Sequence, residues 1–398
     1  MKTAKPNLLL LIPNLGSGGA QRVFHQHRKF FADDFNVTAC VFNFDGAFDY
    51  EKNDNIISLD VPAGNKVIEK IAGFLRRVRK LKKIKRDLNI DVTVSHLEGA
   101  DYVSILSRHK DKLVLWIHGT KLHDQEIKGV TGRLRKSFML PRLYGRADKI
   151  VCVSRGIADE INSIVPSASQ KISTIENGID ITAIRSKENE ALPPGWQSMM
   201  SKHFVVVTHC RFAPQKNLRA LIHVIAELKD TSGLRFVFVG DGEQRDELIA
   251  LGKSLGIAMY NPWLNDTWSD DNRLFFAGQQ PNPFPWLRLS SLYVLPSLWE
   301  GFPLALCEAI VCGLPVVAAD CPTGPKEILD TVPAGLLLPA VFENLQVSVD
   351  LWAQKLRGII GDKAALERYR RIAAEHSDVF SEERTRIETI KVVKSILP

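Results

Sequence analysis

The most informative stretch of this chain is residues 299–315, which read WEGFPLALCEAIVCGLP. Positions 304–312 are apolar except for Glu308, and the helix-ending residues Gly313 and Pro315 follow. The pattern predicts a short buried helix. A single carboxylate in such a helix needs a partner, because an unpaired buried charge is costly.

A second carboxylate, Glu300, precedes this helix and lies in the loop after the strand-like run 292–296. The two carboxylates are therefore directed at one place, where a strand ends and a helix begins. Ligands of open α/β sheets bind at that edge. The alternative is structural, with one glutamate in a loop and one in a helix, both satisfied by backbone donors.

The same region carries a longer motif, made of PSLWEGFP at 296–303, EA at 308–309, GLPVV at 313–317 and DCPTGPKEI at 320–328. This motif resembles the signature of family 4 retaining glycosyltransferases of the GT-B fold, which carry two glutamates separated by seven residues. Here those positions are Glu300 and Glu308. The last run resembles bacterial members that assemble surface polysaccharides and lipid-linked glycans, and matches to the family extend over roughly residues 7–330.

The resemblance implies an α/β protein with two Rossmann-like parallel-sheet domains that face each other across a cleft. Residues 1–180 are expected to bind the acceptor and residues 181–380 the nucleotide sugar. A helix in 381–398 is expected to cross back to the first domain. The chain itself supports doubly wound sheets, because strand-like and helical runs alternate through both halves.

Hydrophobic periodicity places the expected elements along the chain. Strands are expected at residues 7–12, 37–42, 91–95, 112–118, 149–154, 171–175, 203–209, 234–240, 273–276, 291–296 and 314–319. Helices are expected at residues 20–32, 66–88, 155–164, 217–229, 243–255, 304–312 and 381–396. Residues 260–271 depart from the family pattern with a polar loop that contains two tryptophans. This loop either covers the nucleotide or acceptor or is a surface elaboration.

Composition narrows the class of protein. The chain has 398 residues, 45% of them hydrophobic, and six cysteines, none in a C-x-x-C pair, which favours reduced thiols over disulfides or a zinc site. The N-terminal apolar run, 8–12, is too short for a signal peptide and is expected to be a strand. No apolar run approaches the roughly 18 residues that span a bilayer. We therefore expect a cytoplasmic protein, peripheral on the inner face of the cytoplasmic membrane.

The net charge of +7 originates in one segment, residues 66–88, whose own net charge is +8. This segment is a basic amphipathic helix, a type that binds membrane surfaces or anionic ligands. Its cations include Arg76, Arg77, Arg79, Lys80, Lys82, Lys83, Lys85 and Arg86. A second cluster contains Lys128, Arg133, Arg135, Lys136, Arg142 and Arg146. The alternative is a solvated helix face. Nucleic acid is not expected as a partner, because base stacking needs several aromatic residues and the segment has one, Phe74.

Two cations, Arg211 and Lys216, precede the helix expected at 217–229, for which Asn217 is a candidate N-cap. Cations at a helix N-terminus are unfavourable unless an anion lies between them, and such termini bind phosphate. The alternative is that both side chains point to solvent. By resemblance they hold the donor diphosphate and stabilise the leaving nucleoside diphosphate. Since no Asp-x-Asp occurs in the sequence, no metal or other cofactor is expected.

The first half contains two further candidates. The loop PNLGSGGA at 13–20 contains Gly18 and Gly19, but Gln21 breaks the dinucleotide fingerprint, so a tight turn is the alternative. His118 follows an apolar strand, where a histidine can also be structural. The resemblance implies that the two glycines lie against the donor phosphate and acceptor. It also implies that His118 hydrogen-bonds the donor sugar and is not a general base.

By the same resemblance, Glu300 faces the transferred sugar, the backbone from Phe302 through Pro303 to Leu304 reaches the phosphates, and Glu308 binds the ribose hydroxyls. The expected reaction moves a hexosyl or N-acetylhexosaminyl unit, with retention, from a UDP-linked sugar to a polyprenyl-diphosphate-linked glycan in surface polysaccharide or glycan biosynthesis. The alternatives are a GT-B enzyme with a soluble acceptor and, in another class, a non-enzymatic protein that binds membranes or nucleic acid. A sugar-nucleotide epimerase shares the fold but does not need this pair of glutamates.

Overall fold

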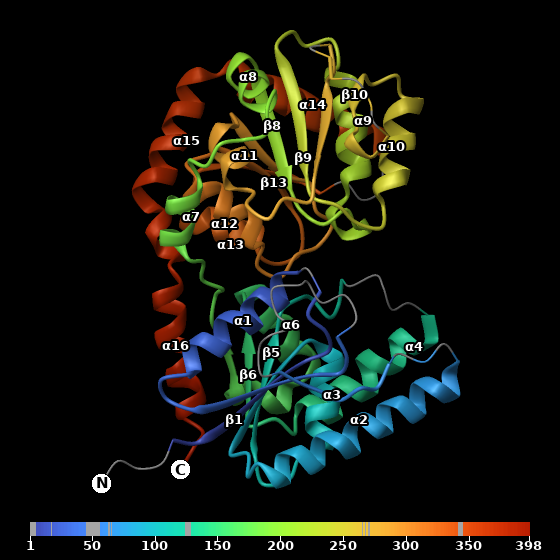
Figure 1. Ribbon diagram of the computed structural model, residues 1–398, viewed down its shortest axis with the longest axis vertical. Helices are drawn as coiled ribbons and strands as arrows, with labels where there is room; N and C mark the ends of the chain where they lie inside the picture. The colour runs from blue at the N-terminus through green and yellow to red at the C-terminus, as the bar shows by residue number, and fades with distance from the viewer. Residues whose placement is uncertain are drawn as a thin grey trace. The chain divides into compact units, whose positions relative to one another are not determined.

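The computed structural model describes residues 5–16, 18–44, 56–62, 64, 66–123, 129–264, 266, 268, 269, 271–340 and 345–398. The chain forms two compact units, one comprising Met1–Asn177 with Glu383–Pro398 and the other Gly178–Glu382 (Figure 1). The boundaries expected from the sequence lie within three residues of these.

The first unit is built on seven parallel strands among its described residues. Their order is β3-β2-β1-β4-β5-β6-β7. The strands are β1 (Asn7–Ile12), β2 (Asn36–Val41), β3 (Ile56–Ser58), β4 (Val92–His96), β5 (Lys112–Ile117), β6 (Lys149–Cys152) and β7 (Ile172–Thr174). The central strand β1 is apolar and buried on both faces, as parallel strands covered by helices are. Strand order reverses between β1 and β4, which makes their carboxyl ends the expected ligand site.

Helices cover this sheet. They are α1 (Gly19–Phe31), α2 (Val67–Asp87), α3 (Glu98–Leu106), α4 (Gly129–Leu134), a π-helical turn η2 (Arg135–Met139), α5 (Leu140–Tyr144), α6 (Arg155–Ile164), η3 (Pro166–Lys171) and α16 (Glu382–Lys394). Helices α2 and α3 pack together, with Leu81 of α2 and Val103 of α3 in one buried cluster with Leu9 and Leu11 of β1.

The C-terminal helix α16 belongs to the first unit although it follows the second in sequence (Figure 1). Arg386 pairs with Asp33 at 2.9 Å and Lys394 pairs with Asp34 at 2.5 Å, just beyond α1. A hydrogen bond from Thr385 to the backbone carbonyl of Glu176, 3.0 Å long, holds its first turn.

The second unit repeats the same plan. Its described strands are β8 (Phe204–His209), β9 (Leu234–Val239), β10 (Met259–Tyr260), β11 (Leu274–Gly278), β12 (Leu292–Leu295), β13 (Val316–Asp320) and β14 (Gly335–Pro339). They are parallel in the order β10-β11-β9-β8-β12-β13-β14. Here the reversal falls between β8 and β12, so the loops after these two strands flank the expected ligand site.

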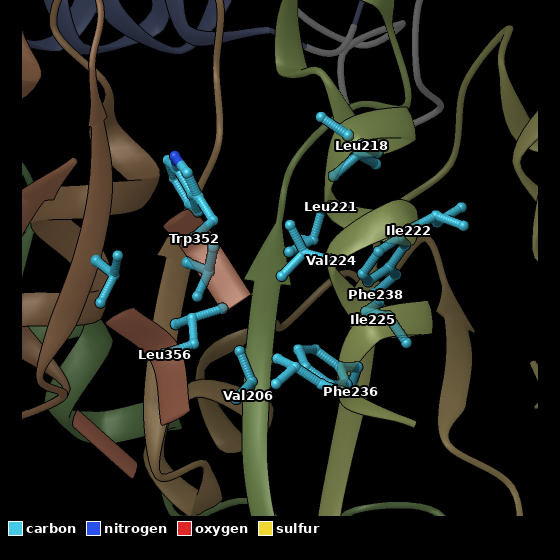
Figure 2. Close-up of a cluster of buried hydrophobic side chains, with 14 of the residues drawn as sticks. Val206, Leu218, Leu221, Ile222, Val224, Ile225, Phe236, Phe238, Trp352 and Leu356 are labelled. Atoms are coloured by element: carbon cyan, nitrogen blue, oxygen red, sulfur yellow. The ribbon is translucent and has the colours of Figure 1, made fainter. Parts of the chain in front are cut away.

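The helices of the second unit are α7 (Ile181–Lys187), α8 (Trp196–Lys202), η4 (Pro214–Lys216), α9 (Leu218–Leu228), α10 (Arg245–Ser254), η5 (Pro262–Leu264), α11 (Phe284–Leu289), α12 (Leu304–Val311), α13 (Pro325–Thr331), α14 (Leu345–Gly361), α15 (Lys363–His376) and η6 (Ser377–Phe380). Figure 2 shows Leu221 and Ile225 of α9 beside Val206 and Phe236 of the sheet, and Leu356 of α14 in the same buried cluster. This packing fixes α9, whose N-terminus adjoins the site described below.

The strands and helices expected from the sequence are present, with ends shifted by at most two residues. The sequence interpretation missed the short strands β3, β10 and β14, and the helices α3, α14 and α15, among others. Strand β10 has two residues and β3 has three, too few to show a repeating pattern. Helix α3 begins two residues after β4 ends, so no turn signal separates the two patterns.

The tryptophan-containing insertion packs on the edge of the second sheet. The Trp268 ring lies 5.1 Å from Trp196 and 4.9 Å from Phe275, between centroids. Trp263 lies 6.0 Å from Phe276. These contacts favour the structural interpretation of the insertion. Its residues 265, 267 and 270 lie outside the described part of the chain.

Candidate active site

Glu300 and Lys216 meet at the carboxyl edge of the second sheet, in the loops after β12 and β8. The Lys216 Nζ is 2.6 Å from the Glu300 Oε1. The hydroxyl of Ser297 donates to the same oxygen at 2.6 Å, and the Gln215 amide lies 3.4 Å from Oε2. Glu300 is 4% exposed, so this is a nearly buried ion pair at the point where strand order reverses.

The run 320–328 shapes the loop that carries Glu300. The hydroxyl of Thr323 donates to the Glu300 carbonyl, and the Glu300 N–H donates to the carbonyl of Pro322 at 3.3 Å. Gly324 has a φ of +89°, and a Cβ there would lie 2.8 Å from the Gly301 carbonyl oxygen. A side chain at Gly324 would therefore push the Glu300 loop away.

Glu300 offsets the unfavourable interaction that was expected between Lys216 and the positive N-terminus of α9. The sequence suggested an external anion for Lys216, but the protein supplies an internal one. Burial by itself lowers the pKa of the Lys216 ammonium, and the adjacent Glu300 outweighs it, so that the pKa lies above its usual value. Lys216 therefore stays charged at neutral pH, but its charge is already paired.

Asn217 was expected to be the N-cap residue of α9, and its position is confirmed. Its side chain, however, makes no capping bond. Its amide instead donates to the carbonyl of Pro296, at 3.3 Å, and its φ is +52°. The side chain is thus used to join the loop after β8 to the loop after β12.

Arg211 lies two residues after β8 and is exposed to solvent. Two glycines hold its loop against the loop after β9. A Cβ on Gly240 would lie 2.0 Å from the Cys210 carbonyl oxygen, and a Cβ on Gly242 would lie 2.5 Å from that of Phe212. These glycines were not identified from the sequence, although a Gly-x-Gly directly after a strand is a usable signal. The structure does not bring Arg211 into the Glu300–Lys216 pair.

Glu308 is buried in α12, as expected, at 1% exposure. Its carboxylate Oε2 lies 3.6 Å from the Nδ1 of His209, the last residue of β8. Glu308 therefore has a polar neighbour, which is the imidazole of His209 on the adjoining strand. His209 was not singled out from the sequence, where it reads as an ordinary strand end.

The start of α12 is the third part of this edge. Pro303 is its N-cap residue, and Phe302 and Leu304 are buried on either side. No side chain caps the helix. The helix has eight residues, and its N-terminus follows the loop of Glu300. The resemblance predicts phosphate contacts at such a helix N-terminus.

The glycine loop is in the first unit and leads into α1 at the carboxyl end of β1. Gly18 is the N-cap residue, with an extended backbone, and Gly19 begins the helix. The Asn14 Oδ1 accepts from the Gly16 N–H at 3.3 Å and from the Gln21 side chain at 3.1 Å. The loop is thus held by its own polar residues. Ser17 lies outside the described residues.

His118 follows β5 and contacts another histidine. Its Nε2 is 2.8 Å from the Nδ1 of His96, the last residue of β4, and the two rings are stacked. His27 of α1 lies 5.0 Å from His96, between ring centroids. Burial, and then the charge of Lys121, lowers the pKa of His118 to about 3. A neutral imidazole with so low a pKa is a poor general base, in keeping with the hydrogen-bonding role that the sequence suggested.

A network of carboxylates adjoins these histidines and was missed from the sequence. Burial raises the pKa of Asp101 to about 7, although Ser95 donates to it at 2.6 Å and Tyr144 at 2.7 Å. Burial would also raise the pKa of Glu98, but Arg135 and then Lys121 outweigh it and lower the pKa to about 2. Two carboxylates of one helix, α3, thus have opposite shifts.

Not all the cations of helix α2 are free: three of them are bound within the first unit. Lys85 is buried and its Nζ lies 2.8 Å from the Asp111 carboxylate. Arg77 donates to the Val61 carbonyl at 2.8 Å, and Lys80 donates to the Leu59 carbonyl at 2.5 Å. These three cations anchor the helix to its own domain, because the carbonyls and carboxylate of the underlying loops and sheet are within their reach.

Other cations of α2 are exposed, and so are its first apolar residues. The exposed cations are Lys70, Arg76, Arg79, Lys82, Lys83 and Arg86. The exposed fractions of Val67, Ile68 and Ile71 are 72%, 80% and 57%. In the second basic cluster Arg135 is buried on Glu98, whereas Lys128 lies outside the described residues.

Two features of the described residues bear on partners. None of the helices there is long and apolar enough to cross a membrane. Among the same residues, no three histidine, cysteine or acidic side chains are grouped as metal ligands. All six cysteines are free thiols.

Two Rossmann-like units, each with polar residues at the edge where its strand order reverses, are the architecture of the GT-B fold. Comparison with known proteins agrees. The family model described as Glycosyltransferase Family 4 matches residues 17–183, and the one described as Glycosyl transferases group 1 matches residues 203–361. The chain belongs to the family 4 glycosyltransferases of the GT-B fold.

Individual proteins resemble it over different lengths. An uncharacterised glycosyltransferase of Methanocaldococcus jannaschii is 27% identical over 64% of this chain and 62% of its own length. The N-acetylgalactosamine-N,N'-diacetylbacillosaminyl-diphospho-undecaprenol 4-alpha-N-acetylgalactosaminyltransferase of Campylobacter jejuni is 24% identical over 96% of this chain and 98% of its own. The crystal structure of HepE from Anabaena in complex with UDP-glucose has a TM-score of 0.75 and 20% identity, and covers 98% of this chain and 99% of that one. The last similarity supports the fold.

Proposed function

We propose that this glycosyltransferase moves a hexosyl or N-acetylhexosaminyl unit from a UDP-sugar to a polyprenyl-diphosphate-linked glycan, with retention at the anomeric carbon. The observation that carries the proposal is the buried Glu300–Lys216 pair at the strand-reversal edge of the second sheet. It combines a carboxylate for the sugar with a cation for the departing diphosphate in one place.

The donor is proposed from the second unit. Lys216, the exposed Arg211 and the uncapped start of α12 are three sources of positive potential, and a diphosphate carries the matching negative charge. Glu308 is then available for the ribose hydroxyls, with His209 beside it. The structural relative bound to UDP-glucose supports uridine as the base. Because the sequence has no Asp-x-Asp, we propose that these cations act without a metal or other cofactor.

The acceptor is proposed from the first unit and from the Campylobacter relative, whose name specifies an undecaprenyl-diphosphate-linked substrate. The exposed residues Ile68, Leu75, Arg79 and Lys82 are spaced by seven, four and three positions, so they lie along one face of α2. A helix face with exposed apolar residues in its first turns and cations further along suits the interface of an anionic bilayer. We propose that this face docks on the cytoplasmic leaflet.

Transfer is tested by incubating the purified full chain with UDP-glucose, UDP-galactose and their N-acetylated forms. Each donor is paired with a polyprenyl-diphosphate-linked sugar or with the same sugar free in solution. We expect one donor to give a product on the lipid-linked acceptor, with an α-linkage by NMR from the α-linked donor. A β-linked product would contradict retention, and equal rates with the free sugar would contradict a lipid-linked acceptor.

Membrane docking is tested separately by sedimentation with liposomes that contain about 30% phosphatidylglycerol. Replacing Arg76, Arg79, Lys82 and Lys83 with Gln should abolish sedimentation, since each cation near the surface contributes on the order of 1 kcal/mol. Lys80 is excluded from this variant because it holds Leu59.

The matched control removes four exposed cations of the second unit, replacing Lys355, Lys363, Arg368 and Arg371 with Gln. The two variants have the same net charge. Equal sedimentation of both would mean that α2 has no special part in docking. Hydrolysis of the UDP-sugar should be unchanged in both.

A further inference from the structure

The polar group behind His118 is His96, a residue to which the proposed function gives no role. His96 is fully buried at the end of β4, and its Nδ1 lies 2.8 Å from the Nε2 of His118. Its ring contacts that of Phe24 edge-to-face and stacks on that of Trp116, at centroid distances of 5.6 Å and 6.2 Å. His96 is thus held in a fixed place, with one nitrogen directed at His118.

Both imidazoles are neutral. Burial, and then the nearby histidines, lowers the pKa of His96 well below its usual value, and the pKa of His118 is about 3. A neutral imidazole has one N–H and one bare nitrogen, so one ring must donate across the 2.8 Å contact and the other must accept. The donor of this bond sets the tautomer of both rings.

The other nitrogen of His96 decides between the two arrangements. Its Nε2 is buried and has no hydrogen-bond partner among the described residues. If His96 accepted from His118, its own proton would sit on this nitrogen as a buried N–H without an acceptor. Buried N–H groups without acceptors are rarer in proteins than buried acceptors without donors. The arrangement with the proton on Nδ1 of His96 is therefore favoured.

We infer that His96 is a positioning residue, which donates from Nδ1 to the Nε2 of His118 and so fixes the His118 proton on Nδ1. His118 is partly exposed, and its Nδ1 has no partner among the described residues. That nitrogen is then an N–H donor, suited to an oxygen of a bound sugar and unable to accept a proton. This inference rests on the proposed function for its consequence in catalysis, but the tautomer itself does not depend on it.

The tautomer is measured in the ligand-free full chain by long-range proton–nitrogen NMR on ¹⁵N-histidine-labelled protein. The His118 signals are assigned by their loss in His118→Gln. We expect a protonated, pyrrole-type Nδ1 and a bare, pyridine-type Nε2. A protonated Nε2 on His118 would overturn the inference, whether or not the chain transfers any sugar.

Two substitutions separate positioning from packing. His96→Phe fills the same space without a donor, and His96→Asn keeps an N–H donor near the Nδ1 position without the ring. We expect His96→Phe to give a mixture of His118 tautomers and about a tenfold fall in kcat/KM for the UDP-sugar. His96→Asn should stay within about threefold of wild type. The reverse order, or an unchanged tautomer in His96→Phe, would mean that His96 acts by packing.

The matched control is His27→Phe. His27 is also buried and neutral, and its ring is 5.0 Å from that of His96, but it makes no hydrogen bond to His118. We expect the His118 tautomer and kcat/KM to be unchanged. If transfer is absent from all variants while the tautomers behave as expected, the proposed function fails and the inference about His96 stands.

Discussion

In both sheets the strand order reverses beside the first strand of the unit, yet the two carboxyl edges hold different kinds of polar group. In the second unit the edge carries a formal ion pair, Glu300 with Lys216. In the first unit the corresponding edge holds His96 and His118, which burial keeps neutral, and Asp101, whose pKa burial raises to about 7. The charge of Glu98 there is balanced by Lys121 and Arg135.

The difference shows that topology sets where a site lies and side chains set what it can do. Paired charges near a helix N-terminus can be redistributed when an anion arrives, which suits a diphosphate. Neutral groups have no ionic partner to exchange for an anion, but they can form directed hydrogen bonds with hydroxyl groups. On this basis the second edge suits a diphosphate and the first suits hydroxyl groups.

The largest expected effect is that of Glu300→Gln. Turnover should fall by about a hundredfold to a thousandfold, because the substitution removes the charge that we propose faces the sugar in the transition state. UDP affinity, measured by calorimetry, should not fall, since Lys216 is released from its partner and becomes free for phosphate. The ion pair thus gives a physical reason to expect different roles, with Glu300 acting on the sugar and Glu308 on the nucleotide.

Glu227→Gln is the control for this substitution, because Glu227 is an exposed carboxylate of the same unit, in α9. It should leave turnover within about threefold of wild type. A loss of UDP affinity in Glu300→Gln as large as that in Glu308→Gln would show that Glu300 contacts the nucleotide.

Glu308→Gln should weaken UDP binding by a factor of about 10 to 150, which corresponds to the roughly 1.5–3 kcal/mol of a hydrogen bond to a charged group. The reason is that a buried carboxylate accepts ribose hydroxyls more strongly than an amide does. Calorimetric titration with UDP measures it. Unchanged affinity, with a stable protein, would mean that Glu308 serves His209 and not the nucleotide.

A smaller effect concerns the neutral edge. The pKa of Asp101 is raised from 3.8 to about 7, so the folded protein holds a proton that the unfolded chain has lost. Stability should therefore fall as pH rises from about 4 to 7, by at most about 4 kcal/mol for a shift of this size. Asp101→Asn mimics the protonated form and should flatten this part of the profile, measured as thermal midpoint against pH.

The exposed Asp159 of α6 gives the control, and Asp159→Asn should keep the wild-type slope. Glu98 contributes in the opposite sense and in another window. Its pKa is lowered to about 2, so its stabilisation is present above about pH 4.5 and is lost toward pH 2. An unchanged slope between pH 4 and 7 in Asp101→Asn would show that Asp101 is ionised in the folded protein.

The smallest expected effect is that of chelation. If the cations of the charged edge replace a metal, excess EDTA should leave transfer unchanged, within about 20% of the untreated rate. Activity assays with and without EDTA, each followed by added manganese, measure this. Loss of activity that manganese restores would show that the charged edge needs a metal.

The sequence by itself determined most of the architecture. Alternating apolar runs gave the central strands and the helices that bear motifs, because the period of hydrophobicity is a local property. The spacing of Glu300 and Glu308 and the turn residues around them indicated the family. Short edge strands such as β3 carried too few residues for the same reasoning.

The tertiary structure alone decided which groups meet. Lys216 and Glu300 are 84 residues apart, and His96 and His118 are 22 apart, and no local pattern specifies either contact. The sequence could show that Glu308 is buried but not that His209 lies beside it. In the same way, only packing reveals that Lys85 is buried on Asp111 while Ile68 is exposed. Periodicity fixes the face on which a side chain lies, but burial and pKa depend on what the rest of the chain brings to that face.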